Sequence, residues 1–167
     1  QISLSDMKFA TDHIVCVLSP IANNANFDSI ALDLHGNNFG VDGGIELYKI
    51  FPSFQNVKKL DISDNKLKGK AMTRIITFME NFNQLDTLYI GDNPLSGKDL
   101  SDFLALLQTF VTSHERLKIL RINGIAEKYD EAFDAFLDFM TTNTSVVALD
   151  ISNNHLTDTS TIPLGEM

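Results

Sequence analysis

The segment LDISDNKLKGK, residues 60–70, concentrates side chains that could do chemistry. Asp61, Asp64 and Asn65 offer oxygen atoms of the kind that hard cations prefer. A calcium loop beginning at Asp61 would need a glycine at its sixth position and a glutamate at its twelfth. A lysine and a methionine stand there instead. The segment is therefore not predicted to bind a metal ion.

Histidine, cysteine and glycine residues form no catalytic pattern either. The four histidines fall in different kinds of element, and only His35 is expected on a strand. The sequence contains no nucleophile elbow, phosphate loop or zinc spacing. Cys16 is expected to pack on the apolar face of the first helix. Gly43-Gly44 is expected in a loop without a basic residue to hold phosphate. We therefore predict neither enzymatic activity nor a cofactor.

An internal repeat accounts for the aspartates. Aligned on its asparagine, VKKLDISDNKL (57–67) matches LDTLYIGDNPL (85–95) and VVALDISNNHL (146–156). SIALDLHGNNF (29–39) fits with Ser29 in place of the first apolar residue. All four follow L-x-x-L-x-L-x-x-N-x-L, the leucine-rich-repeat signature.

Two further copies are incomplete. LKILRINGIAE (117–127) has Ile125 at the asparagine position and Glu127 at the last apolar position, and ISLSDMKF (2–9) has Met7 at the asparagine position. The six anchors are Met7, Asn37, Asn65, Asn93, Ile125 and Asn154. They lie 30, 28, 28, 32 and 29 residues apart. A period of this length gives each unit a strand followed by a full α-helix.

Apolar residues recur at helical spacing in 72–82, 100–111 and 133–140, which predicts a helix in each. Ser96 and Thr157 are expected to cap helices.

Pro52 is expected to mark the end of a helix.

The predicted fold is a right-handed α/β solenoid of ribonuclease-inhibitor-like leucine-rich repeats, with a curved parallel sheet on the concave side and helices on the convex side. Residues 1–167 are expected to be a fragment of such a domain, with about five to six repeats and uncapped at both ends. Residues beyond about Thr159 are expected to be frayed.

The register predicts which side chains share a surface. Four asparagines are expected to turn inward after their strands and to bond backbone groups as a structural ladder: Asn37, Asn65, Asn93 and Asn154. Residues between the buried leucines should project from the concave face in columns. The candidate protein-binding residues on these columns are Asp33, His35, Asp61, Asp64, Tyr89, Asp92, Arg121 and Asp150. Aspartate and serine at these places are common repeat consensus, which is the favoured interpretation; the alternative is an acidic groove for a basic partner.

The fourth unit is irregular. Residues 96–116 form the longest connection between strands, and the strand that follows them lacks its asparagine. This is either local drift or an edge that shapes a partner surface.

Charge and cysteine content narrow the setting. Thirteen Lys and Arg against 22 Asp and Glu give a formal net charge of -9, which argues against a nucleic-acid or anionic-membrane surface. The single cysteine cannot form an intramolecular disulfide and suits a reducing compartment.

The order of the repeats resembles the leucine-rich-repeat region of the CARMIL proteins. The resemblance rests on LDLHGNNF, VKKLDISDNKL and LDTLYIGDNPL, then a lengthened unit ending in LKILRINGIAE, then VVALDISNNHLTD. It implies a cytoplasmic scaffold at the actin cortex that links capping protein, an actin-nucleating complex and myosin-I. The family's capping-protein and proline-rich motifs do not occur here, so no binding residue is carried over.

We therefore expect a non-catalytic scaffold for protein partners, with no nucleic-acid partner and no direct membrane binding by this chain. Its partners would be actin-regulatory proteins or myosin-I, bound mostly through segments outside this chain. One alternative is a GTPase-activating or ribonuclease-inhibitor-type module that uses the same concave face, with Arg121 its only concave-strand arginine. Another is a host-directed bacterial effector.

Overall fold

Strands and helices alternate along the chain. The computed structural model describes residues 1–9, 11–23, 29–54 and 56–157. Its strands are β1 (Ile2–Ser3), β2 (Ile30–Asp33), β3 (Val57–Asp61), β4 (Thr87–Tyr89), β5 (Ile119–Arg121) and β6 (Ala148–Asp150). Its helices are α1 (Thr11–Ala22), α2 (Gly40–Ile50), the 3-10 helix η1 (Phe51–Ser53), α3 (Gly69–Met79), α4 (Gly97–Ser113) and α5 (Glu131–Thr142).

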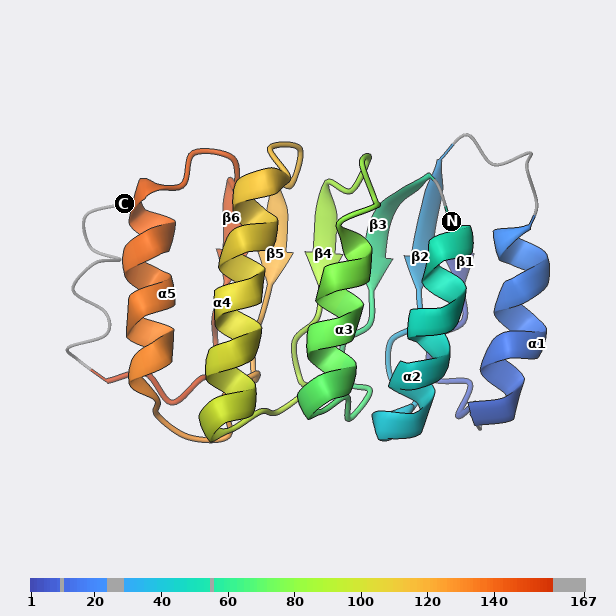
Figure 1. The fold of residues 1–167 in the computed structure, drawn as a ribbon, viewed down its shortest axis with the longest axis horizontal. Helices are drawn as coiled ribbons and strands as arrows, with labels where there is room; N and C mark the ends of the chain where they lie inside the picture. Colours follow the sequence, from blue (N-terminus) through green and yellow to red (C-terminus); the bar gives the residue numbers. More distant parts are fainter. Residues whose placement is uncertain (10, 24–28, 55, 158–167) are drawn as a thin grey trace.

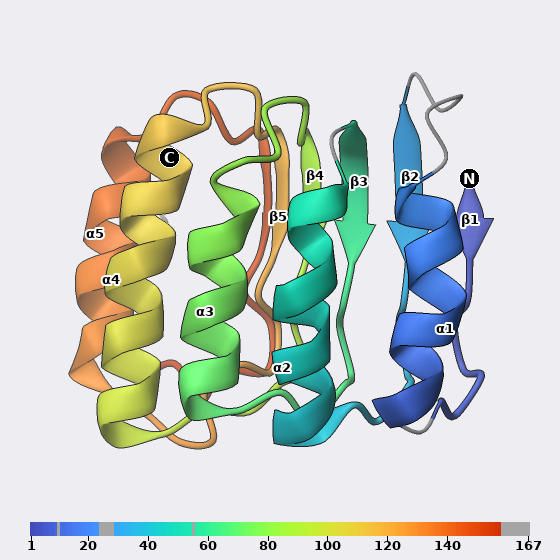
Figure 2. The same cartoon turned by 45° about the vertical axis from the view of Figure 1, so that its right-hand side comes forward.

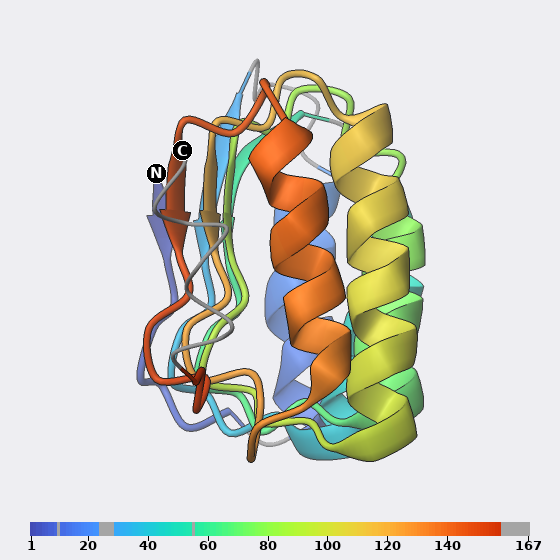
Figure 3. The same ribbon diagram turned by 90° about the vertical axis from the view of Figure 1, so that its left-hand side faces the viewer.

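The strands form one parallel sheet in the order β1-β2-β3-β4-β5-β6, so each strand pairs with the next one in the sequence. The α-helices form a second layer on one face of this sheet (Figures 1 and 2). Seen end-on in Figure 3, β1 and β6 stand farther from the helices than the central strands do, so the helix-free face is concave. The structure confirms the predicted leucine-rich-repeat-type solenoid.

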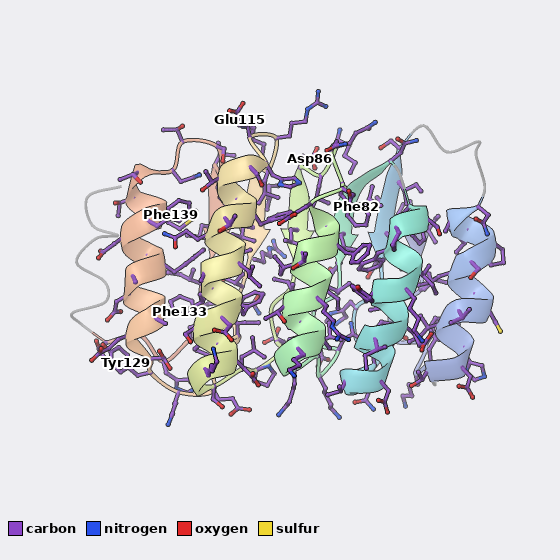
Figure 4. The ribbon with its side chains drawn as sticks, in the orientation of Figure 1. Phe82, Asp86, Glu115, Tyr129, Phe133 and Phe139 are labelled. Atoms are coloured by element: carbon purple, nitrogen blue, oxygen red, sulfur yellow. The ribbon has the colours of Figure 1, made fainter. Side chains whose placement is uncertain are left out.

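Stacking of the repeats buries one continuous core. The second leucine of each central repeat is buried completely, as Leu60, Leu88 and Leu120 show. The helices contribute the predicted apolar stripes, including Phe82 just after α3 and Phe133 on α5 (Figure 4). Each large side chain of this kind contributes roughly 1.5–3 kcal/mol when it leaves water. Among the described residues, each α-helix packs against the α-helices of the adjacent repeats and each strand pairs with the adjacent strands, so each repeat depends on its neighbours.

Two predicted repeat alignments shift by one residue. A register irregularity between Ile30 and Ala31 places Ile30 opposite Val57, so Ile30 supplies the apolar residue that the alignment assigned to Ser29. In the fourth unit, Ala126 pairs with Leu95 and is buried, whereas Glu127 is exposed. The alignment was therefore wrong at Glu127.

Two local predictions were wrong, one about the burial of Cys16 and one about the secondary structure of Gly43-Gly44. Cys16 is exposed, because it lies about 200° around α1 from the buried Ile14 and Leu18, at 100° per residue. Gly43-Gly44 lies inside α2 rather than in a loop. A Cβ at Gly44 would come within 2.8 Å of the Cβ of Ala71, so glycine permits the close approach of α2 and α3.

Helix ends agree with the sequence only in part. α2 ends at Ile50 and Pro52 lies in η1, as predicted. Ser96 is the residue before α4, but its side chain makes no capping hydrogen bond. The lengthened connection is taken up by the 17 residues of α4. The helix expected after Thr157 and the fraying expected beyond Thr159 lie outside the described residues.

Candidate functional site

Parallel pairing lines up one column of side chains across the concave face. In this column each residue is the register partner of the residue on the next strand. We call it the central column; it comprises Asp33, Asp61, Tyr89, Arg121 and Asp150. Residues two positions farther along each strand follow as the next column, with His35, Ser63, Gly91, Asn123 and Ser152. The candidate residues of the sequence analysis on these two columns thus share one surface.

The carboxylates of the central column are held by the residue two positions on. Asp61 Oδ1 accepts the backbone N–H of Ser63 at 3.1 Å and its hydroxyl at 2.5 Å. Asp150 Oδ1 accepts the same two groups of Ser152 at 3.1 and 2.7 Å. These bonds from Ser152, aided by the charge of Arg121, hold the pKa of Asp150 below its usual value.

Asp33 and His35 extend this arrangement toward the N-terminal strands. Asp33 Oδ1 accepts the His35 backbone N–H at 3.2 Å, and its Oδ2 accepts the Ser3 hydroxyl at 3.0 Å. His35 Nδ1 lies 3.0 Å from the hydroxyl oxygen of Ser63. The aspartate carboxylates are therefore fixed in position while they remain only partly buried.

Tyr89 stands at the middle of the central column with two cations over its ring. Lys59 Nζ lies 4.6 Å from the ring centroid, and the guanidinium carbon of Arg121 lies 4.3 Å from it. Neither cation has a carboxylate within 4.0 Å among the residues that the structure describes. Cation–π contacts of this kind stabilise by about 0.5–1 kcal/mol at exposed sites.

Lys59 belongs to this surface although the columns predicted from the sequence do not include it. It precedes Asp61 by two residues, so the alternation of side chains along β3 puts both on the same face. The two-residue spacing therefore predicts that Lys59 lies on the concave face, one column closer to the start of the strands than Asp61.

Asp64 and Asp92 occupy a different kind of position. Their backbones are left-handed, with φ of 50° and 52°, and Gly36, Gly124 and Asn153 share this conformation at equivalent places. Aspartate, asparagine and glycine tolerate left-handed φ best, so the turn itself explains these residue types. Asp92 also accepts the Asn123 amide at 2.8 Å and is thereby tied to the neighbouring repeat.

The four ladder asparagines lie buried behind the turns. Asn65 Nδ2 lies 2.9–3.1 Å from the carbonyls of Leu34, Ile62 and Ser63, and its Oδ1 accepts the Asn37 backbone N–H at 3.0 Å. Asn93 repeats this arrangement one turn farther along, with the Asn65 N–H at 3.0 Å. The asparagines thus join each turn to its neighbour.

The ladder changes where Ile125 replaces asparagine. There the backbone itself bridges the turns, because Leu95 N–H donates to the Ile125 carbonyl at 2.7 Å and Glu127 N–H donates to the Leu95 carbonyl at 2.9 Å. Asn154 Oδ1 accepts both the Ile125 and the Ala126 N–H. Ile125 is fully buried and adds to the core instead.

The concave face carries a hollow of about 360 Å³. It is lined by residues of both columns, including Asp61, Tyr89 and Arg121, and by Ser5 and Asp92. Larger hollows lie at the edge where β4 and β5 begin, near Asp86 and Glu115 (Figure 4). At that edge Lys58 Nζ lies 3.4 Å from Asp86 Oδ2, so the charges of these two residues partly neutralise each other.

Metal and membrane sites are not found in the part of the chain that the structure describes. No group of three or more histidine, cysteine or acidic residues there is arranged to hold a metal ion. No helix among those residues is both long and apolar enough to cross a bilayer.

Strand-helix units of about 28 residues, one curved parallel sheet and an asparagine at the end of most strands define a solenoid of the leucine-rich-repeat class. A sequence model of the Leucine Rich repeat matches residues 142–165. A comparison with curated proteins found no significant match. Repeats of this class commonly mediate protein–protein interaction, for which the extended concave surface is suited.

Proposed function

We propose that the chain is a non-catalytic protein-binding module that engages its partner through the concave face. The observation that carries the proposal is Tyr89 at the centre of the column, with Lys59 and Arg121 over its ring and fixed carboxylates on either side. Tyrosine and arginine are among the residue types enriched at binding hot spots. The rigid sheet holds these side chains in place, so little freedom is lost on binding.

Charge reversal on the face tests this proposal. The immobilised chain is compared with a variant in which Asp33, Asp61 and Asp150 are changed to lysine. A control variant carries Asp102→Lys and Asp138→Lys on the helices, where both residues are outside the concave face. Proteins captured from cytoplasmic extract should be lost with the concave variant and retained with the control. Equal capture by all three proteins would contradict the proposal.

The resemblance to the CARMIL repeat region supports a narrower proposal, a cytoplasmic scaffold of the actin cortex. The lengthened fourth unit and Ile125 in place of an asparagine are the features that carry that resemblance. The narrower proposal for this chain is that its concave face itself binds a cortical protein, so a fluorescent fusion of the chain should concentrate at the cortex of cells. Removal of cortical actin by a depolymerising drug should disperse it. A fusion that is uniformly distributed before treatment would contradict the cortical assignment.

A further inference from the structure

The concave face carries carboxylates on both sides of a cationic centre. Asp61 on β3 and Asp150 on β6 are the outer carboxylates of this pattern. Between these carboxylates lie two cationic groups over the ring of Tyr89 on β4: the ammonium of Lys59, which shares β3 with Asp61, and the guanidinium of Arg121 on β5. The order across the sheet is therefore acidic, cationic, acidic.

Strand spacing sets the length of this pattern. Neighbouring strands lie about 4.8 Å apart, so the three spacings from β3 to β6 separate Asp61 from Asp150 by about 14 Å. An extended peptide that crosses the strands presents side chains on one face every second residue, about 6.7 Å apart. Residues four positions apart then span about 13.4 Å, and the residue midway between them faces Tyr89 and its two cations.

Each position of the bound peptide favours a side chain whose charge is opposite to that of the protein groups it faces. The outer positions favour lysine or arginine, because the Asp61 and Asp150 carboxylates retain oxygen atoms beyond those bonded to Ser63 and Ser152. The middle position favours aspartate or glutamate, because Lys59 and Arg121 have no carboxylate partner among the described residues. This order of charges also rejects partners with the wrong order, since like charges brought together weaken binding.

We infer that the concave face recognises an extended protein segment with the order basic-x-acidic-x-basic. This inference rests on the proposed use of the concave face and specifies the partner that fits it. The acidic carboxylate lies against the Lys59 ammonium and the Arg121 guanidinium, and the basic residues lie against Asp61 and Asp150. Asp33, one strand beyond Asp61 in the register, adds to the attraction at that end.

Peptides of equal composition test the charge order. One labelled nonapeptide has lysine at its third and seventh positions and glutamate at its fifth. The permuted peptide exchanges the glutamate with the first lysine, so the net charge is unchanged. Fluorescence anisotropy should show the ordered peptide binding the chain at least about tenfold more tightly, the factor that 1.4 kcal/mol represents. Equal binding, or no binding of either peptide at millimolar concentration, overturns the inference.

A charge-swapped protein supplies the matched control. The double variant Lys59→Glu, Arg121→Glu should lose the preference for the ordered peptide and should gain affinity for a peptide with lysine at all three positions. Thermal unfolding of the double variant is measured in parallel to check that it is folded. We expect the fold to persist because both side chains lie on the surface. A preference that survives the double substitution overturns the inference.

The peptide and capture experiments separate the two proposals. If capture of partners depends on the concave aspartates but the peptides bind equally, only the charge order is overturned. If capture is indifferent to the concave face, the proposed function falls as well.

Discussion

Asn65 illustrates how a polar side chain can be stable in the core. Its amide nitrogen donates to carbonyl groups of two adjacent turns, and its oxygen accepts the backbone N–H of Asn37. Burial without these bonds would carry the full desolvation penalty of each group.

Asn65→Ala should lower the free energy of unfolding by about 3 kcal/mol, because it leaves several buried backbone groups without partners. Urea denaturation measures the change. Asn83→Ala, at an exposed position after α3, is the matched control and should change stability by less than about 0.5 kcal/mol. Similar losses for both variants would refute the ladder role of Asn65.

Asp150 should make stability depend on pH. Its folded-state pKa is lowered by the Ser152 bonds and by Arg121, so its contribution is present above the ordinary pKa and is lost as pH falls through the lower folded value. Asp150→Asn should therefore reduce stability at about pH 7 by less than about 1 kcal/mol, and the deficit should be smaller at about pH 2. Urea midpoints at both pH values check this, with Asp138→Asn as control. A deficit that grows on acidification would contradict it.

At the scale of elements, glycine controls the distance between two helices. Gly44 of α2 faces Ala71 of α3, where an added Cβ would come within 2.8 Å of the Ala71 Cβ. Gly44→Val should destabilise the chain by roughly 2–3 kcal/mol through overpacking, although valine is the better helix former. Lys49→Val, exposed on the same helix, should cost less than about 1 kcal/mol. Thermal melts compare the two, and an equal effect would show that the helices are not limited by this contact.

Strand and helix placement could be predicted from the sequence because leucine spacing and asparagine anchors both report the repeat. The stripes of α3, α4 and α5 and the central column followed from the same period. The apolar character of Cys16 does not predict its burial. Ile14 and Leu18 set which face of α1 is buried, and Cys16 lies on the opposite face. Ala126 was missed since the turn before it is one residue shorter than the alignment assumed.

The binding surface was predictable only in outline. Column membership follows from alternation along the strands, which identified Asp61, Tyr89 and Arg121. The contact of Lys59 and Arg121 with one ring depends on rotamers and on the curvature of the sheet, which no spacing in the sequence encodes.

For the whole molecule, stability should be greatest in the middle of the stack. Leu88 and Leu149 occupy equivalent positions in β4 and β6, but Leu88 is fully buried between two neighbouring strands whereas Leu149 is only partly buried. Leu88→Ala should cost about 2–5 kcal/mol and Leu149→Ala clearly less. Amide hydrogen exchange should also be slower in β4 than in β6. Uniform protection along the sheet would contradict this neighbour-dependent stability.

Photo-crosslinking tests the use of the concave face most directly. A photoreactive amino acid replaces Ala31, which pairs in register with Lys59 on the concave side, or Lys49, which is exposed on α2. Illumination with the captured partner should give crosslinks from position 31 and few from position 49, and excess ordered basic-x-acidic-x-basic peptide should suppress them. Crosslinks that form mainly from position 49 would place the partner on the helices and contradict concave-face recognition.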